Sequence, residues 1–450
     1  MSLRSLFRTA VLGACTCCLI LSSGSNAAAQ SSIDPFLDRS DEPELRALVD
    51  EMLLRNPTLA AATARARAAG YRAPQLSALP DPTIAVTGFV ASPETRVGPQ
   101  ELMLSASQAL PWRAKLRTRA EAADLEAAAL AAEADAVRLV LLTDLRVGLL
   151  DLSFVDRLSQ VNQSIRAHLS QHEQIARARY ATGSGPGQGV IKLQAAITGI
   201  DHRLLELEAR RLALQAQINA MRDRAPTTPL PATELVIVEP PGLDIDRLIE
   251  LAVAARPDLR AAGYRVEHAD SLGRLADIAR RPDFKVGLTY TLVGDRSDEP
   301  GRLQPPPGNG DDILGLQAGV SIPLWSGRLA AGVEEAAERA SQSVEERRIL
   351  KAGLERDVSE LVGQLPIRWR QLSLIRDVLV VQAQEALDSA TAGYVAGTLN
   401  ALDLLDAEHV LFEAETAIAR ARTDYLIAFA RLEGAIGMPL ARLVGKEFSQ

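Results

Sequence analysis

VIKLQAAITGIDHRLLELEARRLALQAQI (residues 190–218) and LLDAEHVLFEAETAIARARTDYLIAFARL (residues 404–432) share one spacing of apolar residues at a constant offset of 214 positions. In both stretches the apolar side chains recur about every 3.5 residues over roughly four heptads, which is typical of a long helix in a left-handed coiled coil. The shared positions are Val190, Leu193, Ile197, Ile200, Leu204, Leu207, Leu214 and Ile218, and then Leu404, Ala407, Leu411, Ala414, Ile418, Ala421, Ala428 and Leu432. We interpret the chain as a tandem duplication.

The segments around the heptads also match. Each heptad follows a similar turn, Tyr180-Ala-Thr-Gly183 or Tyr394-Val-Ala-Gly397, and Asn56-Pro57 matches Arg256-Pro257 at an offset of 200 positions. The matches predict a first repeat at residues 30–224 (strand pair at about 82–110, hairpin tip near 180–189), a proline-rich linker at 225–243, a second repeat at 244–438 (strand pair at about 282–324, tip near 394–403) and a C-terminal tail at 439–450.

Two further segments predict very long helices. Residues from about Lys115 to Arg179 and from about Arg328 to Ala392 are rich in Ala, Leu, Glu and Arg, and each would span roughly 95–100 Å. Helices of this length must pack side by side to be stable in water, and the expected seam on the first is Leu142, Leu145, Leu149 and Leu152. Pro366 should kink the second helix or split it in two.

The first 29 residues have the pattern of a secretory signal peptide, with Arg4 and Arg8 before an apolar stretch and Ala27-Ala-Ala29 at its end. Leu12-Gly-Ala-Cys15 resembles a lipobox, which leaves lipidation of the N-terminus open. All three cysteines lie in this segment, so catalysis by cysteine and a thiolate zinc site are excluded for the mature chain. Without the two arginines the net charge is about −10, which makes nucleic acid an unlikely partner.

Alternating apolar and other residues predict the two strand pairs. The apolar residues are Phe284, Val286, Leu288, Tyr290, Leu292, Leu314, Leu316, Ala318, Val320 and Ile322, with a weaker set at Ile84, Val86, Val90, Leu102, Leu104 and Ala106. The runs in the second copy are about as long as the 9–11 residues that cross a bilayer as a tilted strand, whereas no segment after the signal peptide has the ~18 apolar residues of a spanning helix. The strands either cross a membrane or form half-buried hairpins of a soluble domain.

Four strands cannot close a barrel, and an open sheet edge is not tolerated in lipid. If the strands cross a membrane, the missing partners must come from other copies of the chain. Three protomers give twelve strands, an even number within the range of outer-membrane barrels, while two or four protomers also remain open on these grounds.

Few residues suggest chemistry, and the chain is not expected to be an enzyme. His168 and His172 stand i, i+4 on a predicted helix and could hold a metal ion, although two solvated surface residues are the simpler interpretation. Asp403 and Asp406 follow the second turn and share one helical face, so they could serve a function or simply complement the helix N-terminus.

Together these features resemble the TolC-like outer membrane factors, the exit ducts of tripartite efflux and secretion systems, over nearly the whole mature chain. The motifs are Gln108-Ala-Leu-Pro-Trp112, Val320-Ser-Ile-Pro-Leu-Trp325, and Tyr394-Val-Ala-Gly-Thr398 followed by Asp403-Leu-Leu-Asp-Ala407. The resemblance implies a mixed fold of all-α coiled coil plus membrane β-barrel: a trimer whose twelve-stranded outer-membrane barrel continues into a twelve-helix periplasmic α-barrel. Leu-Pro-Trp before Lys115-Leu116 is similar to the heavy-metal efflux branch, except that Arg113-Ala114 replace its usual Pro-Gly.

The resemblance also implies the functional positions. A periplasmic adaptor protein, itself bound to an inner-membrane pump of the RND type, would meet the hairpin tips at Tyr180, Gly183, Tyr394, Gly397 and Thr398. Asp403 and Asp406 would form an acidic pore gate, and outer-membrane lipid would surround the barrel. No catalytic residue and no cofactor are implied, and His168 and His172 are only weak metal candidates.

Two departures from the family pattern matter. The first copy has Gly189 and Lys192 where the second has Asp403 and Asp406, so no second acidic ring is expected, and Leu399 stands where some members have an arginine that latches the closed tip. The expected function is a passive exit duct of an efflux system, with heavy-metal cations as the preferred cargo. The alternatives are a soluble periplasmic coiled-coil adaptor or scaffold, a metal-binding sensor that uses the two histidines, and the exit duct of a type I protein secretion system.

Overall fold

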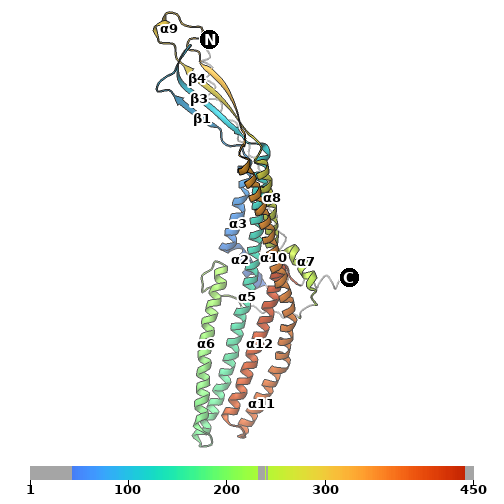
Figure 1. Cartoon of the computed structure of the whole chain (residues 1–450). Helices are drawn as coiled ribbons and strands as arrows, with labels where there is room; N and C mark the ends of the chain where they lie inside the picture. Colours follow the sequence, from blue (N-terminus) through green and yellow to red (C-terminus); the bar gives the residue numbers. More distant parts are fainter. Residues whose placement is uncertain (1–42, 232–238, 240–241, 441–450) are drawn as a thin grey trace. The chain divides into compact units, whose positions relative to one another are not determined.

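The computed structural model describes residues 43–231, 239 and 242–440, all within the compact unit Arg39–Gln450 (Figure 1). The expected signal peptide lies outside the described residues, as do parts of the expected linker and tail. The helices are α2 (Pro43–Arg55), α3 (Pro57–Gly70), α4 (Arg72–Ser77), α5 (Arg113–Ala181), α6 (Gly187–Met221), α7 (Ile245–Ala255), α8 (Pro257–Ile278), α9 (Glu299–Leu303), α10 (Ser326–Leu374), α11 (Val380–Ala396) and α12 (Ala401–Ile436).

The long helices lie where the composition indicates, but proline does not interrupt them as expected. Helix α5 is continuous over 69 residues. The corresponding run in the second repeat passes through Pro366 without a break and changes only at the π turn η1 (Ile375–Leu379) between α10 and α11. Of the two outcomes expected at Pro366, a kink or a split, the split is wrong, because the helix tolerates the missing N–H of Pro366 and changes to a π turn only more than two turns later.

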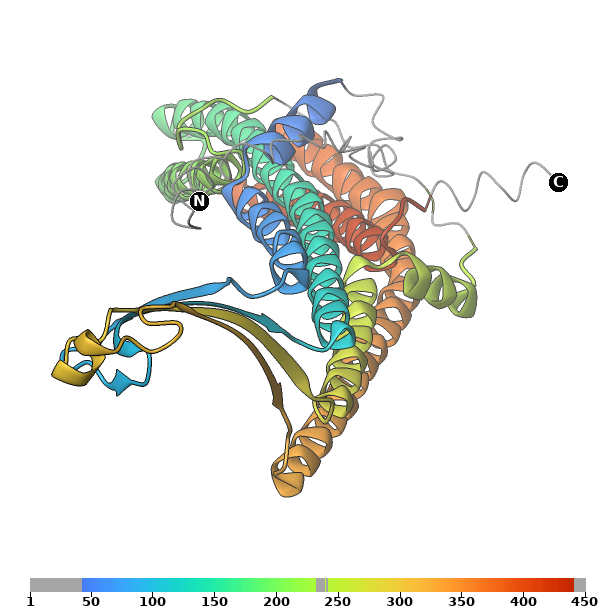
Figure 2. The same ribbon diagram turned by 90° about the horizontal axis from the view of Figure 1, so that it is seen from above.

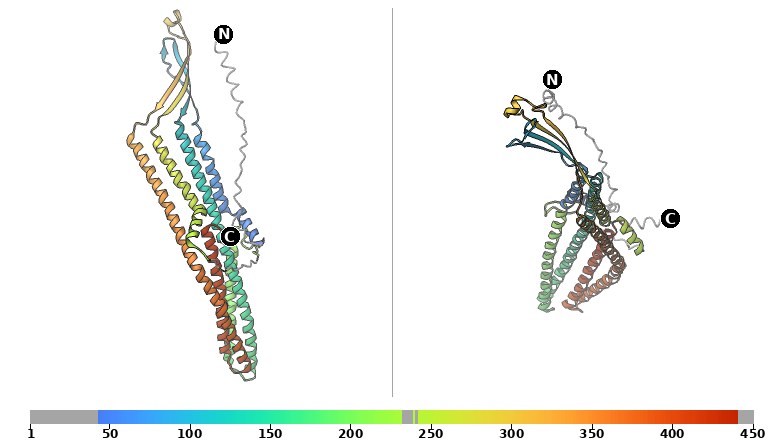
Figure 3. Two further views of the ribbon diagram at one scale, coloured as in Figure 1. Left: turned by 90° about the vertical axis from the view of Figure 1, so that its right-hand side faces the viewer. Right: turned by 45° about the horizontal axis from the view of Figure 1, so that its top comes forward.

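The helices change neighbours along their length. Near the strands, α3 contacts α5, α5 contacts α8, and α8 contacts α10; toward the turns, α5 instead packs against α6 and α12, and α12 against α11 (Figure 3). Each repeat thus contributes a helical hairpin, α5–α6 or α11–α12, and the two hairpins meet where α12 contacts α5.

The strands form one curved antiparallel layer in the order β1 (Thr83–Gly88), β3 (Gly98–Leu110), β4 (Asp283–Val293) and β5 (Ile313–Ser321), as Figure 2 shows, and the short β2 (Glu94–Thr95) pairs with β3. The central pair β3–β4 joins the two halves of the chain. Among the described residues, no strand pairs with the outer edge of β1 or of β5.

The register places the alternating apolar residues on one face of this sheet. Ile84 is opposite Ala106, Ala106 is opposite Leu288, and Leu288 is opposite Leu316, and directly opposed residues share a face. Leu316 is 89% exposed, and the other apolar side chains of the face with at least 39% exposure are Ile84, Val86, Leu104, Phe284, Val286, Leu288, Leu314 and Val320. The opposite face carries mainly Thr, Ser, Gly and Gln.

A buried lysine joins the sheet to the helices. The Lys115 ammonium, at the start of α5, donates to both carboxylate oxygens of Asp283 at 3.0 Å and to the carbonyl of Arg281 at 2.6 Å. The Trp112 N–H donates to the same carboxylate at 2.9 Å. Because Asp283 begins β4, this cluster fixes the exit of β3 against the entry of β4.

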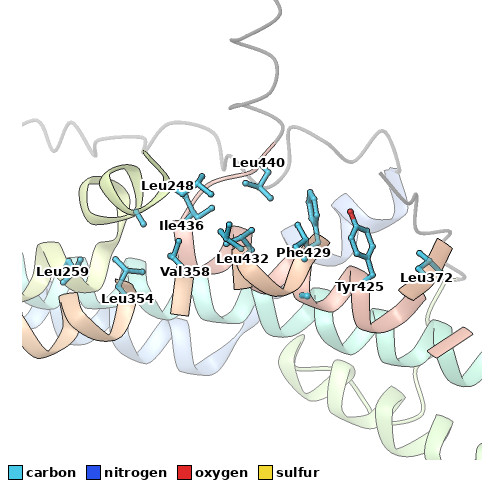
Figure 4. Close-up of a cluster of buried hydrophobic side chains, with 14 residues drawn as sticks. Leu248, Leu259, Leu354, Val358, Leu372, Tyr425, Phe429, Leu432, Ile436 and Leu440 are labelled. Carbon is cyan, nitrogen blue, oxygen red and sulfur yellow. The ribbon is translucent and has the colours of Figure 1, made fainter. Parts of the chain in front are cut away.

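The heptad residues form the cores of the hairpins. Leu193 and Ile200 pack with Val161, Ile165 and other residues of α5, while Leu404 and Leu411 pack with Ala383 and other residues of α11. The expected α5 seam is buried as well, with Leu142, Leu145, Leu149 and Leu152 at most 5% exposed. A third cluster ties α7, α8 and α10 to the end of α12; its labelled side chains in Figure 4 include Leu248, Val358, Tyr425, Phe429 and Leu432.

In both repeats, a side chain in the turn before the second helix donates a hydrogen bond to a backbone carbonyl at the end of the last long helix. The Asn56 side chain caps α3 by accepting from Leu59 N at 3.0 Å and donates to the carbonyl of Met221 at 2.8 Å. In the second repeat Arg256 occupies the equivalent position and donates to the carbonyl of Gly434 at 3.1 Å. An asparagine in the first repeat and an arginine in the second thus donate equivalent hydrogen bonds.

Candidate functional site

Both hairpin tips close with the same backbone turn. Gly183 and Gly397 have φ values of +71° and +79°, the left-handed conformation that favours glycine at a helix C-terminus. Ser184 N donates to the carbonyl of Arg179 at 2.9 Å, and Thr398 N donates to the carbonyl of Gly393 at 2.9 Å. The shared Tyr-x-x-Gly pattern therefore corresponds to a shared turn geometry.

The helices that follow the two turns begin differently. Pro186 precedes α6, and no side chain of the described residues caps that helix start. Asn400 precedes α12 and accepts hydrogen bonds from Leu402 N and Asp403 N, while the Asp403 carboxylate accepts from Asn400 N at 3.1 Å. Asp403 thus completes a capping box, and both Asp403 and Asp406 remain exposed.

The two tip tyrosines have different environments. Tyr180 is 59% exposed, whereas Tyr394 is 3% exposed and packs in the core of the second hairpin. Gly183, Gly397 and Thr398 are exposed at the turns. Of the two tyrosines proposed from the sequence as docking residues, only Tyr180 lies on the surface of the described chain.

Arg179, which the sequence argument did not single out, crosses from the first tip to the second. Its guanidinium donates to the carbonyls of Tyr394 at 2.7 Å and Val395 at 3.2 Å, and it lies 4.5 Å from the centre of the Tyr394 ring. A cation at the carbonyl end of α11 also complements the helix dipole. The only sequence signal for this contact was a basic residue in the last turn of a long helix.

The two histidines on α5 face the second hairpin. His172 is 9% exposed, and its Nε2 lies 3.2 Å from Oε1 of Glu408 on α12; His168 Nδ1 lies 3.8 Å from the same oxygen. The interpretation of both as solvated surface residues is wrong for His172, because the α12 contact could not be inferred from the α5 sequence. No group of three or more side chains in the described part of the chain is arranged to hold a metal ion.

Neighbouring side chains lower the pKa of Glu173, an acidic residue near the first tip. Hydrogen bonds from Arg177 at 2.5 Å and Gln194 at 2.8 Å hold the pKa of Glu173 below its ordinary value. Gln194 lies on α6, so Glu173 links the two helices of the first hairpin as a carboxylate.

The second repeat matches a known family. Residues 248–438 fit the model of the outer membrane efflux protein family. The second half of the chain therefore has the sequence pattern of an outer membrane efflux protein. The matched family consists of outer membrane efflux proteins. Within the described residues, no helix of this chain is long and apolar enough to span a membrane.

The sequences of individual relatives align with only part of this chain. The outer membrane efflux protein BepC of Brucella suis is 23% identical over 313 residues, which are 67% of this chain and 64% of BepC. The cobalt-zinc-cadmium resistance protein CzcC of Cupriavidus metallidurans is 30% identical over 39% of this chain and 38% of its own. The alkaline protease secretion protein AprF of Pseudomonas aeruginosa is 29% identical over 42% of this chain and 38% of AprF. The matches span less than two thirds of each relative.

The fold of this chain is that of solved outer membrane channels. The outer membrane protein VceC of Vibrio cholerae superimposes with a TM-score of 0.75, covering 90% of this chain and 99% of that chain at 20% sequence identity. Identity this low shows the fold alone. The helices and the sheet therefore have the arrangement found in VceC.

Proposed function

We propose that this chain is an outer membrane efflux protein and the passive exit duct of a tripartite export system, with a periplasmic extension made of the helical hairpins. One observation carries the proposal: an open four-stranded sheet with an exposed apolar face and two free edges continues directly into long helices. Lipid would cover the apolar face, and each free edge needs a partner strand within a membrane.

The partner strands would come from other copies of the chain. We propose a homotrimer built from the repeats at residues 30–224 and 244–438, in which β5 of one protomer pairs with β1 of the next. Twelve strands would then form the barrel, and the helices would form a twelve-helix tunnel below it. Twelve is an even number within the range of outer-membrane barrels, and the polar face of the sheet would line the water-filled interior.

Cross-linking between the edge strands tests this assembly. Val86 on β1 and Leu316 on β5 belong to the apolar face, and the only native cysteines are Cys15, Cys17 and Cys18 in the expected signal peptide. The double variant Val86→Cys, Leu316→Cys, with neighbouring β5 positions to allow for register, should yield a covalent ladder that ends at three copies in outer membranes.

A matched pair separates contacts between copies from contacts within one chain. Ala106 and Leu288 are opposite one another on β3 and β4, so Ala106→Cys with Leu288→Cys should link only within a chain and give no ladder. A ladder that ends at two or four copies would overturn the trimer, and the absence of intermolecular products at every edge position would overturn the barrel.

We further propose that Asp403 and Asp406 form the pore gate. Three copies would place six carboxylates around a narrow opening, which favours cations and blocks passage when it is closed. Since Asp403 also caps α12, Asp406→Ala is the cleaner variant. It should weaken cation block of the reconstituted channel, whereas Glu413→Ala, at an exposed site further along α12, should leave the block unchanged. An equal response of the two variants contradicts the gate.

The proposed partners are a periplasmic adaptor that docks at the exposed tip residues Tyr180, Gly183, Gly397 and Thr398, and an inner-membrane pump of the RND type. Tyr394 would support the tip from within. Heavy-metal cations are the preferred cargo, since CzcC carries metal resistance in its name, while AprF keeps an exported polypeptide as the second candidate. Growth of a deletion strain on zinc, cobalt and cadmium distinguishes the two: unchanged metal tolerance contradicts the metal assignment.

A further inference from the structure

The contact between the two hairpins contains a buried pair of ionisable side chains. Glu408 on α12 is 2% exposed and His172 on α5 is 9% exposed, with Nε2 and Oε1 3.2 Å apart. Neither α5 nor α12 needs this pair for its own helix. The pair lies where the first hairpin packs against the second, so its charge state acts on their association.

The pair is only partly satisfied. Nδ1 of His172 and Oε2 of Glu408 are buried and have no hydrogen-bond partner among the described residues. Leaving a buried polar atom unpaired costs free energy, and the cost is greater when the group is charged. The association of the hairpins is therefore sensitive to the net charge that the pair carries.

Few other charged groups face the pair. From α5, His168 approaches Oε1 of Glu408 at 3.8 Å. From α11, the Tyr394 ring lies perpendicular to the His172 ring, with the ring centres 6.3 Å apart. The Arg179 guanidinium lies over the Tyr394 ring and donates hydrogen bonds to carbonyls at the end of α11. The neighbouring acid on α5, Glu173, is already engaged by Arg177 and by Gln194 of α6.

On α12 itself, His409 pairs with Glu413 one turn away, with 3.2 Å between the nitrogen and the oxygen, and Asp406 is exposed. No basic side chain other than the two histidines is within ion-pair distance of Glu408 in the described part of the chain. Compensation of this buried carboxylate thus depends on protons held by imidazoles.

We propose that the His172–Glu408 pair is a proton-dependent clamp between the two hairpins, which strengthens on mild acidification and loosens at alkaline pH. With neutral His172 and ionised Glu408, the buried pair has a net charge of −1. One added proton makes the net charge zero, whichever of the two side chains holds it, and burial favours the neutral pair. Histidine is the side chain that ordinarily gains or loses a proton between about pH 5 and pH 8.

The described part of the first repeat has no equivalent buried His–Glu pair. The residue equivalent to Glu408 at the offset of 214 positions is Gln194, an uncharged side chain that binds Glu173 within its own hairpin. Gln194 is exposed whereas Glu408 is buried. Glu408→Gln keeps the shape of the side chain and removes only its charge, which makes it a structurally conservative test of the clamp.

Distances between the hairpins measure the clamp without any assay of transport. Spin labels at Gln171 on α5 and Val410 on α12, both exposed, would report hairpin separation in the full-length assembled protein, with labelled chains diluted into unlabelled ones. The separated population should rise about tenfold between about pH 6 and about pH 8.5 in the wild-type chain. His172→Gln and Glu408→Gln should each abolish the rise.

A matched histidine provides the control. His202 on α6 is exposed and pairs with Glu206, so His202→Gln should keep the wild-type pH response. A wild-type separation that does not change with pH overturns the clamp, as does a pH response that persists in both His172→Gln and Glu408→Gln. Because the readout is a distance within one chain, it stands whether or not the protein conducts.

Discussion

The tip between α5 and α6 and the tip between α11 and α12 close through the same hydrogen bonds around a left-handed glycine, yet their side chains differ. The first tip exposes Tyr180 and sends Arg179 across to the second. The second buries its tyrosine and begins its next helix with a capping box. Backbone geometry is thus common to both repeats, whereas charge and burial are specific to each.

The two hairpins therefore contribute different side chains to the contact between them. The contacts between the hairpins use Arg179 and His172 from the first repeat against backbone carbonyls and Glu408 of the second. The exposed acids Asp403 and Asp406 lie only on the second. We infer that the first hairpin holds the second in place and that the second carries the gate.

The two repeats should differ most in the loss of helix stability caused by an alanine substitution away from the tips, at the equivalent positions Arg211 and Tyr425. Tyr425 is fully buried, with its ring centre 5.3 Å from that of Trp369, and Arg211 forms a partly exposed ion pair with Asp156. Tyr425→Ala should lower the opening free energy of α12 by about 3–5 kcal/mol, and Arg211→Ala should lower that of α6 by about 1 kcal/mol or less. Hydrogen exchange of the two helices measures both, and equal losses would contradict the contrast.

A smaller effect is expected at the start of α12. Asn400→Ala removes the side-chain acceptor for Leu402 N and Asp403 N and should cost about 1 kcal/mol of local helix stability. Exchange of the first-turn amides of α12 should accelerate, while those of α6, which lacks such a cap, should not change. Asn400→Asp keeps an acceptor oxygen and should restore protection; if it does not, the cap is not the cause.

The smallest effect depends on pH. Burial opposes ionisation of Asp258, but the hydrogen bonds and charge of Arg256 outweigh it and hold the pKa of Asp258 below its ordinary value. The resulting stability is fully present above the ordinary pKa of about 3.9 and is lost as the pH falls through the lower value in the folded chain.

The thermal midpoint of Asp258→Asn should therefore lie below that of the wild-type chain at neutral pH, and the gap should close on acidification. At the equivalent position the first repeat has Thr58, which does not titrate in this range. The effect of Thr58→Ala should thus be independent of pH. A gap for Asp258→Asn that is constant with pH would show that the carboxylate charge is irrelevant.

The sequence predicted those features that depend on one periodicity. The heptads placed Leu193 and Leu404 in the hairpin cores, the alternation placed Leu288 and Leu316 on one sheet face, and the repeated glycines marked turns with positive φ. Each of these properties follows from residues close together in the chain.

Features that depend on distant contacts were not predicted. The burial of His172 requires Glu408, which lies 236 positions away and beside an Ala of the heptad. The Arg179 contact with Tyr394 spans 215 positions. Pro366 was expected to kink or split its helix, but α10 continues through it, and the neighbouring Leu365 is fully buried.

In the proposed trimer, neither the barrel nor the tunnel exists in a single chain. The mass of the native protein extracted from outer membranes with detergent, measured by native mass spectrometry, tests it most directly. We expect a complex of three mature chains that is released only by detergent. A monomer, or a protein recovered without detergent, would contradict it.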